Sequence, residues 1–239
     1  MKFRLLFPLL LMLSSASFAQ TAELLAQPDL SEGVMAYPRL APATPFADTI
    51  NAALAKIDKA QGGDECTTSG GPPYTRSIEV TAQGPRFLSF VVSEQWMCGA
   101  HPEEQRSAFV YDLTTGKPVD WTKMLPPRVA GRASVSKGLI RIGTLSSAVL
   151  SQAYMAGHAS SADCKAIHAD AEFHFLLWPD ARKHELVIDQ NDLPHIAAAC
   201  GGPVSLSLSK LKELGVGKPL LDALTAAKPT TLANYGAKR

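Results

Sequence analysis

The residues with the most chemistry to offer form a short motif, Gly99-Ala100-His101-Pro102, between two strand-like runs. An imidazole held on a turn between rigid strands can donate or accept a hydrogen bond, or contact a charged partner, near neutral pH. Trp96 lies just before the motif, and such an aromatic side chain could stack on a sugar ring or anchor a protein partner. We therefore take these five residues as the candidate binding site.

The same motif also has a purely structural interpretation. Gly99 can supply an unusual backbone angle, Pro102 can begin the next strand, and His101 can bond to local carbonyl groups. One histidine without an identified base or nucleophile gives no mechanism, so we name no catalytic residue and expect a protein that is not an enzyme. Glu94, Asp112 and Asp120 could meet as acids, although carboxylates at turns and strand ends are more often solvated.

Two further groups of residues could support chemistry, and both have simpler structural explanations. A metal site could use the imidazole and thiolate ligands of four residues, namely His158, Cys164, His168 and His174. Their spacing is irregular and a disulfide would remove the thiolate, so we predict no metal and no cofactor.

The Ser-x-x-Lys pattern of serine acyl enzymes occurs three times, at Ser134–Lys137, Ser207–Lys210 and Ser209–Lys212. Its companion motifs are missing, which favours chance.

The chain has an even number of cysteines, which in an exported protein favours disulfides. The four are Cys66, Cys98, Cys164 and Cys200. Three pairings are possible. We prefer Cys66 with Cys98 and Cys164 with Cys200, because each pair joins neighbouring regions of the chain, and each bridge would contribute about 3 to 4 kcal/mol in the chain-entropy model.

The first 19 residues have the pattern of a secretory signal peptide. Lys2 and Arg4 precede an apolar run from Leu5 to Leu13, and Ser17-Phe18-Ala19 forms a small-residue exit. No later stretch is long and apolar enough for a membrane helix. We expect a periplasmic or secreted protein without stable membrane insertion after cleavage.

The charge balance excludes one class of partner. The whole chain has a formal net charge of +1, with 23 basic and 22 acidic side chains, and no basic cluster. Nucleic-acid binding depends on Lys and Arg clusters that neutralise phosphates, so we expect no nucleic-acid partner. A hydrophobic fraction of 46% is enough for a substantial core.

The elements that would position these residues follow from hydrophobic periodicity. We predict a strand over 34–40, a helix after Thr44 with Phe46, Ile50, Leu54 and Ile57 on one face, and strands over 75–82, 86–96 and 107–112 in an antiparallel meander. Leu88, Phe90 and Val92 should face the core. The stretch 132–156 is expected to be mainly helical. Further strands are predicted over 173–177, 185–189 and 204–208, followed by a helix over 209–214 that ends at Gly215, and a loose tail after Ala226.

Aromatic side chains at strand ends are expected mostly in the core. Tyr111, Trp121 and Trp178 are assigned there, and Trp96 is the expected exception because it adjoins the His101 motif.

The order of several short motifs resembles a known exported domain. These motifs are Tyr37-Pro38-Arg39-Leu40, Ile50-Asn51, the Gly99–Pro102 motif, Asp112-Leu113-Thr114-Thr115-Gly116-Lys117, and Gly201-Gly202-Pro203 before a short helix. They resemble the extracellular domain of unknown function found in lysozyme-sensing anti-sigma factors and beside peptidoglycan deacetylase domains. The resemblance covers about residues 34–215. We therefore divide the chain into a signal peptide (1–19), an N-terminal segment (20–33), this domain (34–215) and a C-terminal tail (216–239).

The resemblance implies an α+β fold, with helices packed on an antiparallel or mixed sheet, in a single domain that we expect to hold two disulfides. It also implies a binding role at the cell envelope, toward a lysozyme-like protein or a cell-wall component. The chain shows no anti-sigma region or deacetylase domain, and residues 193–200 lack the tyrosines expected before the glycine pair, so lysozyme recognition does not transfer directly. The competing hypotheses are a cell-wall hydrolase, with His101 and an acidic partner as acid and base, and a structural envelope protein.

Overall fold

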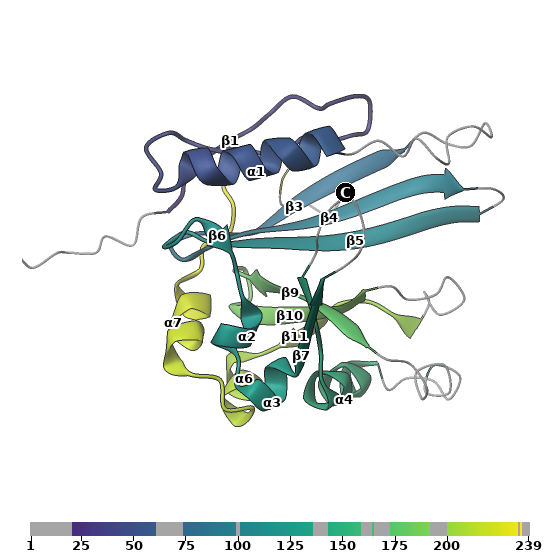
Figure 1. The fold of residues 1–239 in the computed structure, drawn as a ribbon, viewed down its shortest axis with the longest axis vertical. Helices are drawn as coiled ribbons and strands as arrows, with labels where there is room; N and C mark the ends of the chain where they lie inside the picture. The colour runs from purple at the N-terminus through teal and green to yellow at the C-terminus, as the bar shows by residue number, and fades with distance from the viewer. Residues whose placement is uncertain are drawn as a thin grey trace, which may run out of the picture.

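Figure 1 shows the protein as a computed structural model with two large antiparallel sheets, a small two-stranded sheet of β1 and β2, and helices packed around them. The structure describes residues 21–60, 74–98, 101–135, 143–158, 164, 173–191, 200–233 and 235, without the side chains of 97, 98 and 101–103. Its elements are β1 Leu24–Leu25, β2 Arg39–Leu40, α1 Ala47–Ala60, β3 Thr75–Gln83, β4 Phe87–Cys98, β5 His101–Asp112, β6 Lys117–Pro118, α2 Trp121–Met124, α3 Pro127–Ala130, β7 Arg132–Val135, β8 Gly143–Ser146, α4 Ala148–Gly157, β9 His174–Asp180, β10 Glu185–Asn191, β11 Val204–Leu206, α6 Leu208–Glu213 and α7 Lys218–Ala226.

The first large sheet has the order β3-β4-β5-β6 and confirms the predicted antiparallel meander. Side chains alternate across its two faces. Leu88, Phe90 and Val92 are fully buried on the face that packs against α1, as predicted. The side chains at 87 and 91 point to the opposite face, which packs toward the second sheet.

Helix α1 covers the first sheet with a narrower apolar face than the sequence predicts. Ile50 and Leu54 are fully buried against the sheet. The prediction is wrong for Phe46, which precedes the helix with φ 60° and is 46% exposed. Its ring and Cβ lie over Gly116, where a side chain would come within 2.6 Å of the Phe46 Cβ atom.

The second sheet has the order β11-β10-β9-β8-β7, and it corrects the helical prediction for 132–156. Residues 132–135 and 143–146 form the hairpin strands β7 and β8, and helix begins only at Ala148. Gly131 adopts φ 60° just before β7, and Leu145 pairs with Phe175 of β9. Tertiary pairing therefore decides the conformation of a segment whose local pattern is ambiguous.

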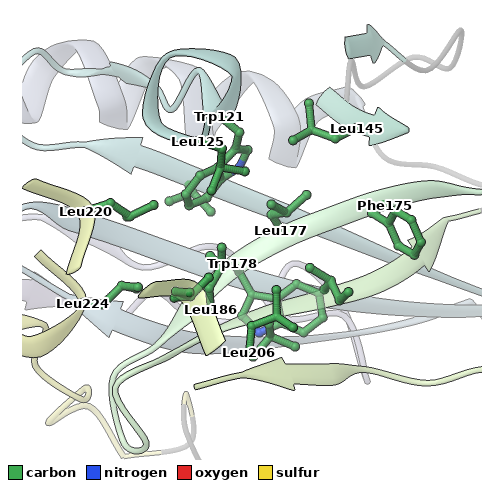
Figure 2. Close-up of a cluster of buried hydrophobic side chains, with 14 of the residues drawn as sticks. Trp121, Leu125, Leu145, Phe175, Leu177, Trp178, Leu186, Leu206, Leu220 and Leu224 are labelled. Carbon is green, nitrogen blue, oxygen red and sulfur yellow. The ribbon is translucent and has the colours of Figure 1, made fainter. Parts of the chain in front are cut away.

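Both sheets contribute to one large apolar cluster. Figure 2 shows its centre, where Leu177 and Trp178 of β9 and Leu186 of β10 lie among Trp121 and the α7 residue Leu220. The second cluster fills the space between α1 and the first sheet. Tyr111, Trp121 and Trp178 are all buried, which confirms their assignment to the core.

The predicted loose tail after Ala226 is instead packed along the outer edge of β3. The Gln83 backbone N–H donates to the Lys228 carbonyl (2.8 Å), and the Val80 backbone N–H donates to the Tyr235 carbonyl (2.6 Å). The Gln83 side chain also donates to the Ala22 carbonyl (2.6 Å) and accepts from the Thr231 N–H (3.2 Å). Segments near both ends of the chain thus meet at one glutamine.

One of the two predicted disulfides is confirmed. Cys164 and Cys200 are bonded, with Cα atoms 5.3 Å apart. The predicted partner bridge depends on Cys66 and on the Cys98 side chain, which lie outside the described part of the chain. None of the described helices is long and apolar enough to cross a membrane.

Candidate functional site

The candidate site lies on the β4–β5 hairpin, whose strands continue well past the hydrophobic core. Each strand has 12 residues, but among the described side chains the core members of β4 end at Val92 and those of β5 begin at Ala108. We call residues 93–98 and 101–107 the distal hairpin. Six residues of β4 and seven of β5 reach roughly 20 to 24 Å. Figure 1 shows this end of β4 and β5 extending beyond α1 and the strands of the second sheet.

The structure places the predicted site residues at the tip of this hairpin. Cys98 pairs with His101, and Met97 pairs with Pro102, so the predicted four-residue turn is shorter: His101 and Pro102 already belong to β5. Gly99 and Ala100 lie outside the described residues. Pro102 fits in this strand because its missing N–H points toward the outer edge of the sheet.

Trp96 is the described aromatic side chain of the predicted site. It is half-buried, belongs to neither hydrophobic cluster, and pairs with Glu103 across the hairpin. Neighbouring Gln95, Glu104 and Gln105 are exposed. This end of the hairpin therefore combines one partly accessible indole with polar side chains, a composition that is typical of recognition surfaces.

A buried polar network supports the hairpin on the α1 side. The Tyr74 hydroxyl donates to the Glu94 carboxylate, and burial, followed by this carboxylate, raises the pKa of Tyr74. Two residues after Tyr74, on β3, the fully buried Arg76 donates to Asp58 of α1 (2.6 Å) and to the Met35 carbonyl (2.6 Å). These bonds tie β3 to α1 and to the segment before β2, although Arg76 Nη1 has no hydrogen-bond partner among the described residues.

Asp58 is the centre of that network. Besides Arg76, it accepts from Arg39 Nη2 (2.5 Å) and from the Tyr37 N–H (3.3 Å). The Arg76 guanidinium lies over the Tyr37 ring, with its carbon 5.3 Å from the ring centroid, which adds a cation–π contact. Burial raises the pKa of Tyr37 well above its usual value.

On the opposite face, an ion pair ties the hairpin to the second sheet. Arg106 of β5 donates to Asp189 of β10, whose side chain is only 3% exposed. Burial raises the pKa of Asp189, and the Arg106 guanidinium opposes that shift. The partners are 83 positions apart in sequence, so no local pattern could have indicated the pair.

The second sheet also contains a hydroxyl–imidazole contact that the sequence did not reveal. Ser134 Oγ lies 3.2 Å from His174 Nδ1 and 2.7 Å from Thr144 Oγ1, on three adjacent strands. Ser134 belongs to one of the Ser-x-x-Lys patterns, but its contact is made 40 positions away. The pattern itself gave no signal for this partner.

The remaining candidates have local structural roles. Ser207 caps α6 by accepting from the Lys210 N–H (3.2 Å). Asp120 caps α2, and its hydrogen bonds to Thr122 and Lys123 lower its pKa. Asp112 pairs with Arg86 (3.1 Å), so the three acids that could have met each have a separate contact.

The predicted zinc ligands do not form a metal site in the described residues. Cys164 is in a disulfide, and His158 Nε2 contacts the Gly202 carbonyl (2.9 Å). His168 lies outside the described residues. Across the part of the chain that the structure covers, no group of three or more His, Cys, Asp or Glu residues is arranged to hold a metal ion.

No protein-family model matches the chain, and no curated protein matches it. The chain is similar to the crystal structure of a DUF3298 family member from Bacteroides fragilis, with a TM-score of 0.43 and 10% sequence identity. The similarity covers 76% of this chain and 68% of the Bacteroides chain.

Proposed function

We propose that this protein is an exported, non-catalytic binding domain of the cell envelope, and that the distal hairpin is its contact element. The observation that carries the proposal is the continuation of β4 and β5 beyond the core. A twelve-residue strand pair whose distal half contributes none of its described side chains to the hydrophobic clusters is poorly explained by stability alone. Its partner would be a lysozyme-like protein or a cell-wall component, as the family resemblance implies.

The support under the hairpin fits a recognition role. The Tyr74–Glu94 contact holds one face, and the Arg106–Asp189 ion pair holds the other. Binding elements that are fixed before contact lose less conformational entropy on association. A half-buried indole at such a position can provide apolar contact area without requiring a new side-chain conformation.

Calorimetric titration of the purified, oxidised protein with lysozyme, and separately with soluble peptidoglycan fragments, tests this function. Trp96→Ala and His101→Ala should each weaken saturable binding by about tenfold or more if the hairpin is the contact element. Lys123→Ala is the matched control, because this side chain is 82% exposed on α2 and should leave the affinity unchanged.

The outcomes separate the partners and the classes of function. Absence of heat with lysozyme would overturn the lysozyme-like partner, and absence of heat with both ligands would overturn recognition of either class. Binding that the hairpin variants leave unchanged would place the contact elsewhere on the protein.

The competing enzyme hypothesis has one structural observation in its favour, the Ser134–His174 contact. A serine hydrolase would attack an acyl carbonyl through Ser134 Oγ while an imidazole accepts its proton. Release of soluble products from peptidoglycan that is lost in Ser134→Ala would replace the binding proposal. The hydroxyl shared with Thr144 is otherwise the ordinary cross-strand hydrogen bond of a sheet.

A further inference from the structure

The outer edge of β5 has unpaired backbone groups next to the distal hairpin. Strand β6 pairs with β5 only at Tyr111 and Asp112, and the Val119 N–H donates to the Val110 carbonyl (2.8 Å). Val110 therefore directs its carbonyl outward, and alternation along the regular β4–β5 register makes Ala108, Arg106 and Glu104 do the same. Among the described residues, no backbone group pairs with these three at the outer edge.

This edge has a defined length and centre. It begins with His101, the first residue of β5, and ends at Phe109, because Val110 is already bonded to the segment that follows β6. A second antiparallel strand that uses the whole edge would therefore be centred opposite Gln105. If that strand is the same edge from another copy, a two-fold axis passes beside Gln105.

The charges on the edge fit this register. Two-fold pairing about Gln105 places Glu104 opposite Arg106 of the other copy, and Arg106 opposite the other Glu104. Within one chain Arg106 lies 3.9 Å from Glu104 and also pairs with Asp189, yet the Glu104 side chain is 55% exposed and that of Arg106 32% exposed. Opposite charges facing each other across strands stabilise a pair, whereas a shift of the centre by one residue would bring Arg106 opposite itself.

We propose that two copies of this chain associate through their β5 edges, in antiparallel register centred on Gln105. Each Glu104–Arg106 pair would exchange two backbone hydrogen bonds, and each Ala108 N–H would donate to the Pro102 carbonyl of the other copy. Pro102 lacks a donor, so the edge is weakened at its ends. The association does not depend on the proposed recognition role.

The projecting hairpins would lie side by side in this arrangement. In the two-fold pair, the tip of one hairpin lies beside Phe109 of the other, where β6 ends the free edge. The two cores would then lie at opposite ends of the paired strands, because each hairpin extends past its own core.

A cysteine at the two-fold axis tests the register directly. Residues opposite each other at a non-hydrogen-bonded position have Cα atoms about 4.5 Å apart, which is within the range that a disulfide spans. Gln105→Cys should give a covalent dimer on a non-reducing gel of the full chain. Lys123→Cys, which is similarly exposed but far from the axis in sequence and element, should stay monomeric.

Sedimentation equilibrium of the unmodified protein, up to about 1 mM, should show a concentration-dependent dimer. Glu104→Lys places two like-charge pairs in the interface and should weaken the dimer about tenfold or more, whereas the exposed control Glu213→Lys should not. A monomer throughout this range would overturn the proposal. So would a dimer that Glu104→Lys leaves intact and Gln105→Cys fails to cross-link, because it would use another face.

Discussion

The buried charge of Asp58 is balanced by two arginine side chains. Its carboxylate is almost completely buried and is bonded to two guanidinium groups, one of which, that of Arg76, has no exposure at all. Ionic groups removed from water are tolerated only when each remains paired. Removing one partner of this cluster should therefore lower the free energy of unfolding by more than the loss of an ordinary surface ion pair does.

We predict that Asp58→Ala lowers the free energy of unfolding by about 3 to 5 kcal/mol, because it leaves the Arg76 charge buried without its partner. Chemical denaturation followed by circular dichroism measures the change. Asp48→Ala, an exposed position in the first turn of the same helix, should cost less than about 1 kcal/mol. Equal effects at both positions would show that the cluster does not stabilise the fold.

The raised pKa of Asp189 predicts how the stability of the protein changes with pH. Burial raises its pKa in the folded state despite the Arg106 guanidinium, so the folded protein holds this proton more tightly than the unfolded chain. The stabilisation that this raised pKa gives to the folded protein is fully present below the unfolded pKa, about 3.9. It is lost as pH rises through the higher pKa of the folded state.

Asp189→Asn should therefore gain stability relative to the unmodified protein as pH rises from about 3 to 7. Denaturant unfolding of both proteins across this range gives the difference at each pH. A difference that moves in the opposite direction would mean that the ion pair with Arg106 outweighs desolvation.

At the scale of elements, the start of the second sheet depends on one backbone position. Gly131 has φ 60° and ψ −127°, and a Cβ atom there would lie 2.2 Å from the Ser146 carbonyl oxygen. Gly143, at the start of β8, has nothing within 4 Å of its Cβ direction. The two glycines therefore allow a direct comparison within one pair of strands, because a side chain has room at 143 and none at 131.

Gly131→Ala should destabilise the protein by about 3 kcal/mol or more, through the strained backbone and the clash with β8. Gly143→Ala should change stability by less than about 1 kcal/mol. Thermal denaturation of both variants provides the comparison. A tolerated alanine at 131 would contradict the β7–β8 geometry.

The same region shows how far the sequence could predict the fold. Patterns of apolar residues predicted β3, β4, β9, β10 and the second half of β5, because each of these stretches has a buried face that is visible in its own sequence. Residues 132–156 carry no such clear pattern, and pairing with β9 decided their structure. Helix α7, on the other hand, has an apolar face that was overlooked within the supposed tail.

The candidate site was predictable only in part. The strand pattern located the hairpin and Trp96, but not the length by which the hairpin exceeds the core, because that depends on where α1 and the second sheet end. The contacts of Arg106 and Ser134 join distant strands. Such contacts are products of topology, which local sequence does not encode.

For the whole molecule, the segments outside 34–215 take part in the core. Ala22 and Leu24 are buried, as are Leu220, Leu224 and Tyr235. The Tyr235 hydroxyl donates to the Ala36 carbonyl (3.0 Å), and its ring belongs to the cluster under α1. These segments are part of the same packed structure.

A fragment comprising residues 34–215 should consequently fail to unfold cooperatively, whereas residues 21–239 should show one sharp transition. Loss of several buried apolar side chains, each contributing about 1.5 to 3 kcal/mol, exceeds the stability of a typical domain. Calorimetry of both proteins checks this. A cooperative transition in the shorter fragment would show that the segments outside 34–215 are not required for folding.

The closure of the β3 edge also sets an order of events during synthesis. Gly33 and Met35 bond to one end of this strand, whereas Lys228 and Tyr235 bond to the other. A ribosome that has completed β3 has most of the chain still to make, so the strand must wait for almost the last residue before its edge is closed. Until then the nascent protein exposes a sheet edge that other chains could pair with, and a chaperone that protects this interval would be most useful late in translation.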